Sequence, residues 1–447
     1  MFKSKLTFFR WYVFGVIGLL AVWMIGGNLL ASYLEKEIDR KIAQKVKELE
    51  EQYPDPEPND SALKLEAILL KEFGLGLIDK TDGQGVFKFG DYMGYHPDFD
   101  GSHDEFEKIK ESLDQYIHNQ ISKPNDEIEP PPEELQNYLE SKADALNKVQ
   151  NHVLNSELPK LNTVFETIYL LKGDYSVVSP LDSPEFTNFQ KILALDILEK
   201  QRQGKNQEAR EMLEVSWRIS QLLKNYSFIT GKSLALTIGE FQTGVIRKLD
   251  NLSPYWQERL LEHDYPLSIL KTIEEWHLSL YNVTRNLDLY RDTSVLTLLS
   301  SSNPLSTSYL RLSAVDYYGT MTDELEGLPT RNVCSPEEKV IPNLAWWNLL
   351  DNSMRIWIIS ANEELRAAKY MLELEFTQKI LQVKELAKKQ GKWPDSIPNL
   401  DSKFCPDRQY IYKVSEDGTM TISLDKQPEW VKDRDLPLIY SDRTPPQ

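Results

Sequence analysis

The sequence is poor in cysteine, with only Cys334 and Cys405 among 447 residues. Two thiols exclude a small scaffold that is held together by many disulfides. If the chain folds outside the cytoplasm, the pair could form one disulfide that closes a segment of 71 positions. The chain-entropy model would credit such a bridge with ~4 kcal/mol of stability. Two unpaired buried thiols are an equally good interpretation.

The sequence also lacks the common catalytic motifs. It contains no H-E-x-x-H, C-x-x-C or G-x-S-x-G pattern. Gly231-Lys232-Ser233 looks like the end of a phosphate-binding loop, but Tyr226 stands where that loop needs a glycine. The six histidines are scattered, and we expect His263 and His277 to be ordinary helix or surface residues rather than ligands. We therefore assign no catalytic, cofactor-binding or metal-ligating residue.

One dense polar cluster still deserves comparison with metal sites. It consists of His96, Asp98, Asp100, His103, Asp104 and Glu105. Carboxylate and imidazole groups this close could hold a divalent cation. The spacing is not that of a complete EF-hand loop, because only two acids, Asp98 and Asp100, precede Gly101 and His96 stands where the loop has its first carboxylate. The alternative is an acidic turn that caps a helix beginning at residue 103.

Basic residues are in the minority, and the formal net charge is −18. The first 34 residues carry +3, so the remainder carries −21. This acidity argues against a partner made of nucleic acid and against a domain that lies flat on an anionic bilayer. Hydrophobic residues make up 41% and charged residues 27%, which is typical of a folded soluble portion.

Long hydrophobic runs are absent except for one. Trp11 to Leu34 contains no Asp, Glu, Lys or Arg. As a helix, these 24 residues would extend roughly 36 Å, enough for a hydrocarbon core of ~30 Å. Lys3, Lys5 and Arg10 precede the run, so the positive-inside rule predicts a cytoplasmic N-terminus with residues 35–447 on the other side. A cleaved signal peptide is the alternative, but the run exceeds the usual apolar region of such peptides.

The residues after this run continue as a helix. Ile38, Ile42, Val46 and Leu49 form one apolar stripe on a charged helix over 35–52. We expect the stripe to pack on the protein's own domain, with a short coiled-coil seam as the alternative. Prolines at 54, 56 and 58 then predict a stiff linker.

Helical patterns dominate the rest of the chain. A helical hairpin is predicted over 185–203 and 206–224, and its turn, Gly204 to Ala209, is similar to that of a tetratricopeptide repeat. No second copy follows at a period of 34 residues, so an ordinary αα-hairpin remains the alternative. A long helix is predicted over 343–390, with Gly391 as its C-terminal cap.

The clearest β signal lies near the C-terminus. Tyr410, Tyr412 and Val414 stand at alternate positions, and so do Met420, Ile422 and Leu424. Glu416-Asp417-Gly418 between them predicts a β-hairpin. We expect the tail from residue 428 to be extended.

Two resemblances follow from these features. The hairpin at 189–224 and the helix after it resemble an uncharacterised class of bacterial single-span membrane-anchored α-helical proteins. The ending Gly391-Lys392-Trp393-Pro394-Asp395-Ser396, followed by the β-hairpin, is similar to that class and to the headpiece of pseudopilins of secretion systems. The chain differs from pseudopilins because it has no prepilin-type Gly-Phe-Thr cleavage site. The resemblance implies a membrane anchor and an α-rich fold, and it carries no known activity.

Taken together, the patterns predict a mainly α fold with an N-terminal transmembrane helix. A multi-helix extracytoplasmic domain, partly tetratricopeptide-like, and a small C-terminal β-hairpin follow it. We divide the chain into the cytoplasmic tip and anchor (1–34), a stalk helix and proline-rich linker (35–60), the α-helical domain (61–390), and the hairpin and tail (391–447).

The predicted function is a membrane-anchored scaffold or adaptor without a cofactor, which presents a helical surface to an envelope or secretion protein. The absence of catalytic motifs favours this role over an enzyme. The alternative is an envelope-associated hydrolase that uses carboxylates or a metal near residues 96–105. Converging carboxylates in a deep pocket would favour the alternative.

Overall fold

The computed structural model describes residues 2–54, 58–77, 102–161, 164–173, 183–223, 229–285, 304–327, 333–334, 345, 347–348, 351–433 and 436–443. Its α-helices are α1 (Phe2–Gln52), α2 (Asp60–Phe73), α3 (Ser102–Ile121), α4 (Glu133–Asn155), α5 (Val164–Leu171), α6 (Ser183–Arg202), α7 (Asn206–Ser220), α8 (Ile229–Lys248), α9 (Tyr255–Leu260), α10 (Tyr265–Arg285), α11 (Pro304–Gly327) and α12 (Asp351–Gln390). The strands are β1 (Tyr410–Val414), β2 (Met420–Leu424) and β3 (Ile439–Asp442), and short 3-10 helices lie at Gln221–Leu223 and Glu429–Asp433.

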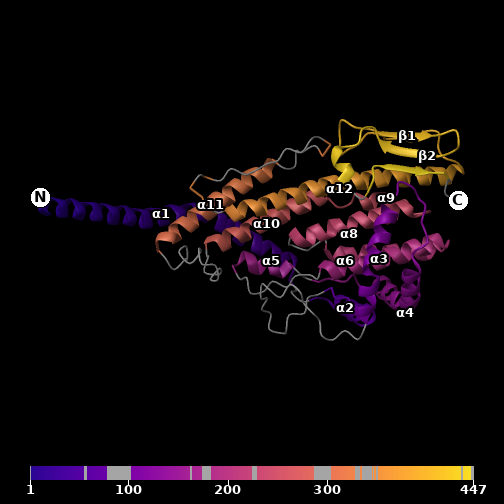
Figure 1. Cartoon of the computed structure of the whole chain (residues 1–447), viewed down its shortest axis with the longest axis horizontal. Helices are drawn as coiled ribbons and strands as arrows, with labels where there is room; N and C mark the ends of the chain where they lie inside the picture. The colour runs from indigo at the N-terminus through magenta and orange to yellow at the C-terminus, as the bar shows by residue number, and fades with distance from the viewer. Residues whose placement is uncertain are drawn as a thin grey trace.

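The helices form one elongated bundle with α1 at one end and the small sheet at the other (Figure 1). The predominantly helical fold predicted from the sequence is confirmed. The main core lies among α2, α3, α4 and α6 to α12, where side chains such as Phe73, Phe106, Phe189 and Leu213 are fully buried. The burial follows from the apolar faces of these helices, which can leave water only by packing against one another.

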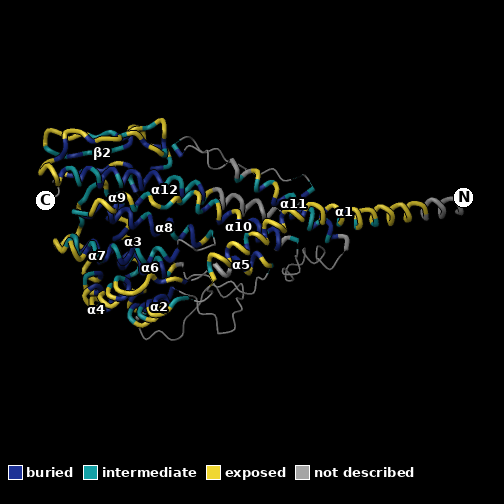
Figure 2. The backbone as a smooth tube through the Cα atoms, turned by 180° about the vertical axis from the view of Figure 1, so that it is seen from behind, coloured by how far each residue is buried: buried dark blue, intermediate teal, exposed yellow. Residues whose placement is uncertain are grey.

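Helix α1 runs without interruption from Phe2 to Gln52, across the predicted boundary at residue 34. Of the helices that the structure describes, α1 is long and apolar enough to cross a membrane. Figure 2 shows α1 exposed from Trp11 to Leu20 and partly covered by the bundle from Gly27 onward. The predicted stripe of Ile38, Ile42, Val46 and Leu49 is buried against residues of α5, α10 and α11, which confirms packing on the protein's own domain.

The C-terminal sheet lies along the outer side of α12 (Figure 1). The predicted hairpin is confirmed: β1 and β2 pair in antiparallel register, with Tyr410 opposite Leu424 and Val414 opposite Met420. Gly418 adopts a left-handed φ of 81° in the connecting turn, a conformation that glycine tolerates without strain. Tyr410, Met420, Ile422 and Leu424 point toward α12 and form a second apolar core with Phe376.

Two sequence predictions about this region were wrong. The tail is not extended throughout, because Glu429–Asp433 forms a 3-10 helix. Its extended part is β3, which pairs with β2, and the Ser441 amide donates to the carbonyl of Pro124 at 2.7 Å. The long helix begins at Asp351 rather than at 343, since Ala345, Trp347 and Asn348 are not helical. There the Asn348 side chain donates to Ser313 O and to Asp316, contacts with α11 that a sequence pattern cannot reveal.

Helices α6 and α7 form the predicted antiparallel hairpin, with Gly204 in a left-handed conformation (φ 76°) at its turn. Ala209 is fully buried, as close packing of the two helices requires. The hairpin contributes to the main core on both of its helices, and its similarity to a tetratricopeptide repeat stays a prediction.

Candidate functional site

The junction between α1 and the bundle is the most unusual feature of the described structure. Its buried positions on α1 are Gly27, Ala31, Glu35, Ile38, Ile42, Val46 and Leu49. They recur every three or four residues, so they share one face of the helix. The face begins inside the uncharged run and continues to the end of α1. The domain therefore packs against the C-terminal part of the apolar segment as well as against the charged part that follows it.

Helix α11 makes the closest approach to this face. Ser308 Oγ donates to the carbonyl oxygen of Met24 at 3.3 Å. A Cβ atom placed on Gly27 would lie only 3.0 Å from the Cβ of Ser308. Glycine is therefore suited to this crossing, because a larger residue would force the two helices apart.

Arg311 of α11 joins three successive turns of α1, and we call Arg311, Asn28, Ser32 and Glu35 the Arg311 cluster. The guanidinium donates to Asn28 Oδ1 and Ser32 Oγ, each at 2.8 Å. It also forms a bidentate ion pair with Glu35, in which Nε donates to Oε1 at 2.9 Å. The Glu35 side chain is 6% exposed and that of Arg311 22% exposed. Such a planar, bidentate contact orients one helix on the other.

Further ion pairs continue up the same helix. Asp39 pairs with Arg285 of α10 at 2.6 Å, Lys45 with Glu275 of α10 at 2.8 Å, and Glu50 with Lys172 at 2.6 Å. Together with the Arg311 cluster, they connect α1 to the bundle from residue 28 to residue 50. The second half of α1 is thus an integral helix of the domain and not a free stalk.

Two adjoining cavities form a groove beside α6 and α8, which we call the α6–α8 groove. One cavity, of about 500 Å³, is lined by α6, α8 and Glu363 of α12. The other, of about 290 Å³, extends it toward α3 and Leu436. Lys191 and Thr237 line both cavities. Apolar side chains such as Leu234 alternate with polar ones along the groove, a lining suited to an amphipathic ligand.

Acidic groups also reach the second cavity, where Asp114, Glu240 and Glu373 contribute to the lining with His118. Asp114 accepts a hydrogen bond from Lys191 Nζ at 2.7 Å. Glu240 pairs with Arg366 at 3.0 Å, and Arg366 also donates to Thr237 at 2.8 Å. Since basic side chains already neutralise two of these carboxylates, the geometry is that of ion pairs within a wall rather than of an acid and base pair.

Buried basic residues of α8 and α12 have structural partners as well. Lys248 Nζ donates to the carbonyls of Lys123 (3.4 Å), Asn125 (2.5 Å) and Glu127 (3.3 Å), and burial lowers its pKa to about 7. Lys384 Nζ donates to the carbonyls of Arg247 and Leu249 at the end of α8. Both lysines satisfy carbonyl oxygens that the helix end and the loop would otherwise leave unpaired.

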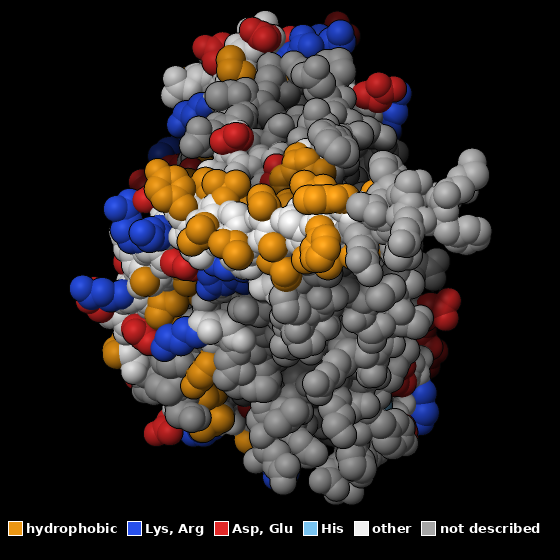
Figure 3. Space-filling view, turned by 90° about the vertical axis from the view of Figure 1, so that its left-hand side faces the viewer, with side chains coloured by type: hydrophobic (Ala, Val, Ile, Leu, Met, Phe, Trp, Pro, Cys, Tyr) orange, Lys and Arg blue, Asp and Glu red, His pale blue; other side chains and the backbone are white. Residues whose placement is uncertain are grey.

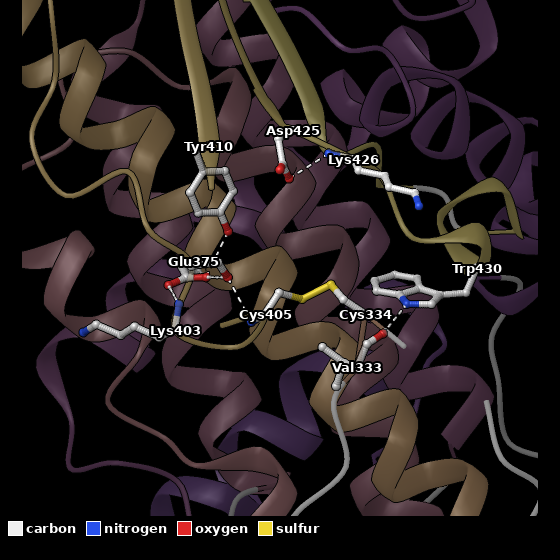
Figure 4. Close-up of a disulfide and its surroundings, with 10 residues drawn as sticks. Val333, Cys334, Glu375, Lys403, Cys405, Tyr410, Asp425, Lys426 and Trp430 are labelled. Carbon is white, nitrogen blue, oxygen red and sulfur yellow. Dashed lines mark hydrogen bonds between the residues drawn. A yellow bond between two sulfur atoms is a disulfide. The ribbon is translucent and has the colours of Figure 1, made fainter. Parts of the chain in front are cut away.

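The two cysteines form a disulfide, with 5.7 Å between their Cα atoms (Figure 4). The bond links the short described segment 333–334 to the chain just before β1. On one side of it, Glu375 of α12 accepts from the Tyr410 hydroxyl at 3.0 Å; on the other, Trp430 Nε1 donates to the carbonyl of Val333 at 2.7 Å. Of the two interpretations that the sequence left open, the disulfide is the correct one.

The predicted polar cluster is only partly covered by the structure. Positions 96–101 lie outside the described residues. His103 Nδ1 lies 3.2 Å from the carbonyl oxygen of Gly74, and Glu105 pairs with Lys142 at 2.8 Å. The hydrogen bond and charge of Lys142 lower the pKa of Glu105. In the described part of the chain no group of three His, Cys, Asp or Glu residues is arranged to hold a metal ion.

The other sequence candidates lie in α8, in α10 and in the bend that precedes α10. Gly231-Lys232-Ser233 belongs to the first turns of α8, where Lys232 is buried and desolvation lowers its pKa to about 8. His277 is buried on α10 with its ring 5.6 Å from that of Tyr317. His263 lies against Tyr265, with ring centroids 4.5 Å apart.

Sequence reasoning missed the Arg311 cluster, although one signal was present. Gly27, Ala31 and Glu35 are spaced by four residues and stand in phase with the stripe that begins at Ile38. The periodicity therefore crosses the end of the apolar run, whereas a division at residue 34 treats the two parts as separate. The partner Arg311 could not be found this way, because it lies 276 positions from Glu35.

Comparison of the chain with protein-family models, with curated proteins and with solved structures finds no match.

Proposed function

We propose that this protein is a single-pass membrane scaffold or adaptor that holds its helical domain outside the cytoplasm in a set orientation. The observation that carries the proposal is the junction of α1 with the bundle. A helix that is long and apolar enough to cross a membrane continues directly into the packed face and ion pairs of the domain. A movement or tilt of the anchor would therefore be transmitted to the whole domain.

Two observations support an extracytoplasmic domain. Lys3, Lys5 and Arg10 precede the apolar run, which favours a cytoplasmic N-terminus. The Cys334–Cys405 disulfide suits a compartment in which disulfides form and persist, such as a bacterial envelope.

The α6–α8 groove is the surface that we assign to the partner. It is lined by apolar and polar groups from α6 and α8, both rigid elements of the main core. Grooves between helices commonly accept an amphipathic segment of another protein. An envelope or secretion protein that presents such a segment is the partner we expect.

Site-specific photocrosslinking in cells tests this proposal. A photoreactive amino acid at Thr187, which lines the groove, should capture one protein in stoichiometric yield. The same amino acid at Glu416, in the turn between β1 and β2, is the control and should not. A Thr230→Arg change, which adds a bulky cation to the groove, should abolish the capture at Thr187. Equal capture from both positions, or none from Thr187, would count against the scaffold.

The hydrolase alternative stays a prediction. Most of the 96–105 cluster lies outside the described residues, and of its described members Glu105 is paired with Lys142. Hydrolysis of envelope polymers by the purified full-length protein, with loss of activity in a His103→Gln variant, would favour that alternative.

A further inference from the structure

We propose that the Pro304 end of α11 lies in the outer leaflet of the membrane, so that this end of the domain contacts lipid. The surface concerned is formed by the first turns of α11, around Tyr309, with Trp347 beside it. Its partner is the headgroup and upper acyl region of the lipid. The inference rests on the membrane span in the proposed function, and it is independent of any protein partner.

The first argument is one of length. Ser308 contacts Met24, which is only 13 residues beyond Trp11, or roughly 20 Å along the helix at 1.5 Å per residue. A hydrocarbon core of ~30 Å needs about 20 helical residues, so a span that begins at Trp11 ends near Leu30. The contact with Ser308 then falls below the outer surface of the hydrocarbon. Tilting α1 would only increase the number of residues that lie within the core.

A position of α1 closer to the cytoplasm would place the Ser308 contact at the outer edge of the hydrocarbon, but it would also bury a charge. If Met24 stood at the outer edge of the hydrocarbon, its inner edge would fall near residue 5. Arg10 would then lie well inside the hydrocarbon, where a charged side chain costs ~2.5–3.5 kcal/mol at the helix centre on insertion scales. The cheaper arrangement keeps Arg10 at the inner surface and brings the end of α11 into the outer leaflet.

The aromatic residues of α1 place Met24 at the same depth in the membrane as the length argument does. Trp11 and Tyr12 are strongly exposed at one end of the run and Tyr33 at the other, at 74%, 65% and 73%. Tryptophan and tyrosine favour the two membrane–water interfaces, and 21 residues separate Tyr12 from Tyr33, which corresponds to roughly 32 Å. Met24 lies nine residues below Tyr33 on this scale. Figure 3, a view from the α1 end, shows hydrophobic side chains gathered along the exposed apolar part of α1.

The polar groups at this level already have partners within the protein. Asn28 Nδ2 donates to the carbonyl oxygen of Met24 at 2.7 Å, and Asn28 Oδ1 accepts from Arg311. Side chains near the edge of the hydrocarbon need internal partners because little water is present there. On α11, the Tyr309 ring lies edge-on to Trp347, with centroids 6.4 Å apart, an aromatic pair suited to the interface.

The test measures depth with a fluorescent probe. Full-length protein with a single reactive cysteine is labelled with an environment-sensitive dye and reconstituted into phosphatidylethanolamine/phosphatidylglycerol vesicles that contain nitroxide-labelled lipid. The native cysteines do not react while their disulfide is intact. The probe positions are Ile17→Cys on the exposed part of α1, Thr307→Cys on α11, Gly319→Cys on the same helix, and Glu416→Cys in the distant hairpin turn. Gly319 lies about 18 Å further along α11 than Thr307, and no atom within 4 Å would meet a side chain there.

Quenching by the nitroxide lipid should be several-fold stronger at Thr307 than at Gly319 and absent at Glu416. Equal, weak quenching at Thr307 and Glu416, with strong quenching at Ile17, would overturn the membrane contact and leave the anchor intact. Weak quenching at Ile17 as well would overturn both the anchor and the contact. If the Thr307 variant does not fold, amide exchange of the unlabelled protein replaces the quenching experiment. Slower exchange at residues 306–310 in vesicles than in micelles would support the membrane contact, and unchanged exchange would overturn it.

Discussion

Removal of the Arg311 guanidinium should destabilise the packing of α1 on the helical domain. In an Arg311→Ala variant, Asn28 and Ser32 lose a donor and the Glu35 carboxylate keeps its charge at a site where its side chain is 6% exposed. Breaking a buried ion pair by removing one partner costs about 3–5 kcal/mol. Since the Arg311 side chain is 22% exposed, water can reach the site, and we expect the lower end of that range.

Amide hydrogen exchange in detergent micelles is the appropriate measurement, because it reports the local opening of α1 and α11 separately from global unfolding. A loss of ~3 kcal/mol should speed exchange at residues 28–38 and 308–315 by roughly 100-fold, at 1.4 kcal/mol for each factor of ten. Exchange in the C-terminal sheet should not change, since β1 to β3 pack on α12 and not on α1.

The neighbouring pair Arg40–Glu37 provides a matched control on the same helix, with side chains 73% and 59% exposed. Arg40→Ala should change exchange by less than about fivefold, because exposed ion pairs contribute ~1 kcal/mol or less. The double variant Arg311→Met with Glu35→Met should recover most of the loss, since it leaves no unpaired charge. Equal effects of Arg311→Ala and Arg40→Ala on exchange would refute the conclusion that the Arg311 cluster stabilises the packing of α1 on the domain.

Three further predictions concern the interior of the domain. Reduction of the Cys334–Cys405 disulfide, which spans 71 positions, should lower the free energy of unfolding by about 4 kcal/mol in urea titrations, and unchanged stability would contradict the chain-entropy estimate. Gly244→Ala should destabilise the fold by ~1–3 kcal/mol, because the new Cβ would stand 2.6 Å from the Cβ of Ile121. Gly319→Ala, where the new Cβ meets open space, should stabilise the fold by up to ~1 kcal/mol. Thermal melts that rank the two variants the other way would disprove the α3–α8 packing. Burial lowers the pKa of His277 to about 3, so the unfolded chain takes up a proton below pH 6.5 while the folded chain does not. The contribution of this neutral side chain to the free energy of unfolding should therefore be complete above pH 6.5 and smaller by about 2 kcal/mol at pH 5. Urea titrations of a His277→Gln variant should lack that part of the pH dependence.

Much of the fold follows from local patterns. The apolar run, the stripe from Ile38 to Leu49, the Gly204 turn and the alternation of β1 and β2 are all visible in the sequence, because each is set by contacts within a few positions of the chain. The same locality explains the errors. Strand β3 is only four residues long, and it depends on β2 and on the loop at Pro124 for its partners.

The sequence by itself therefore determined that this protein has a membrane-length helix, an α-rich domain and a terminal hairpin, since hydrophobic periodicity and turn residues act over short distances. Only the tertiary structure decided that the two cysteines pair and that Arg311 meets Glu35 across 276 positions. It alone revealed that α1 is part of the domain from Gly27 onward. Such contacts depend on how distant helices pack, and no local pattern records which surfaces will meet.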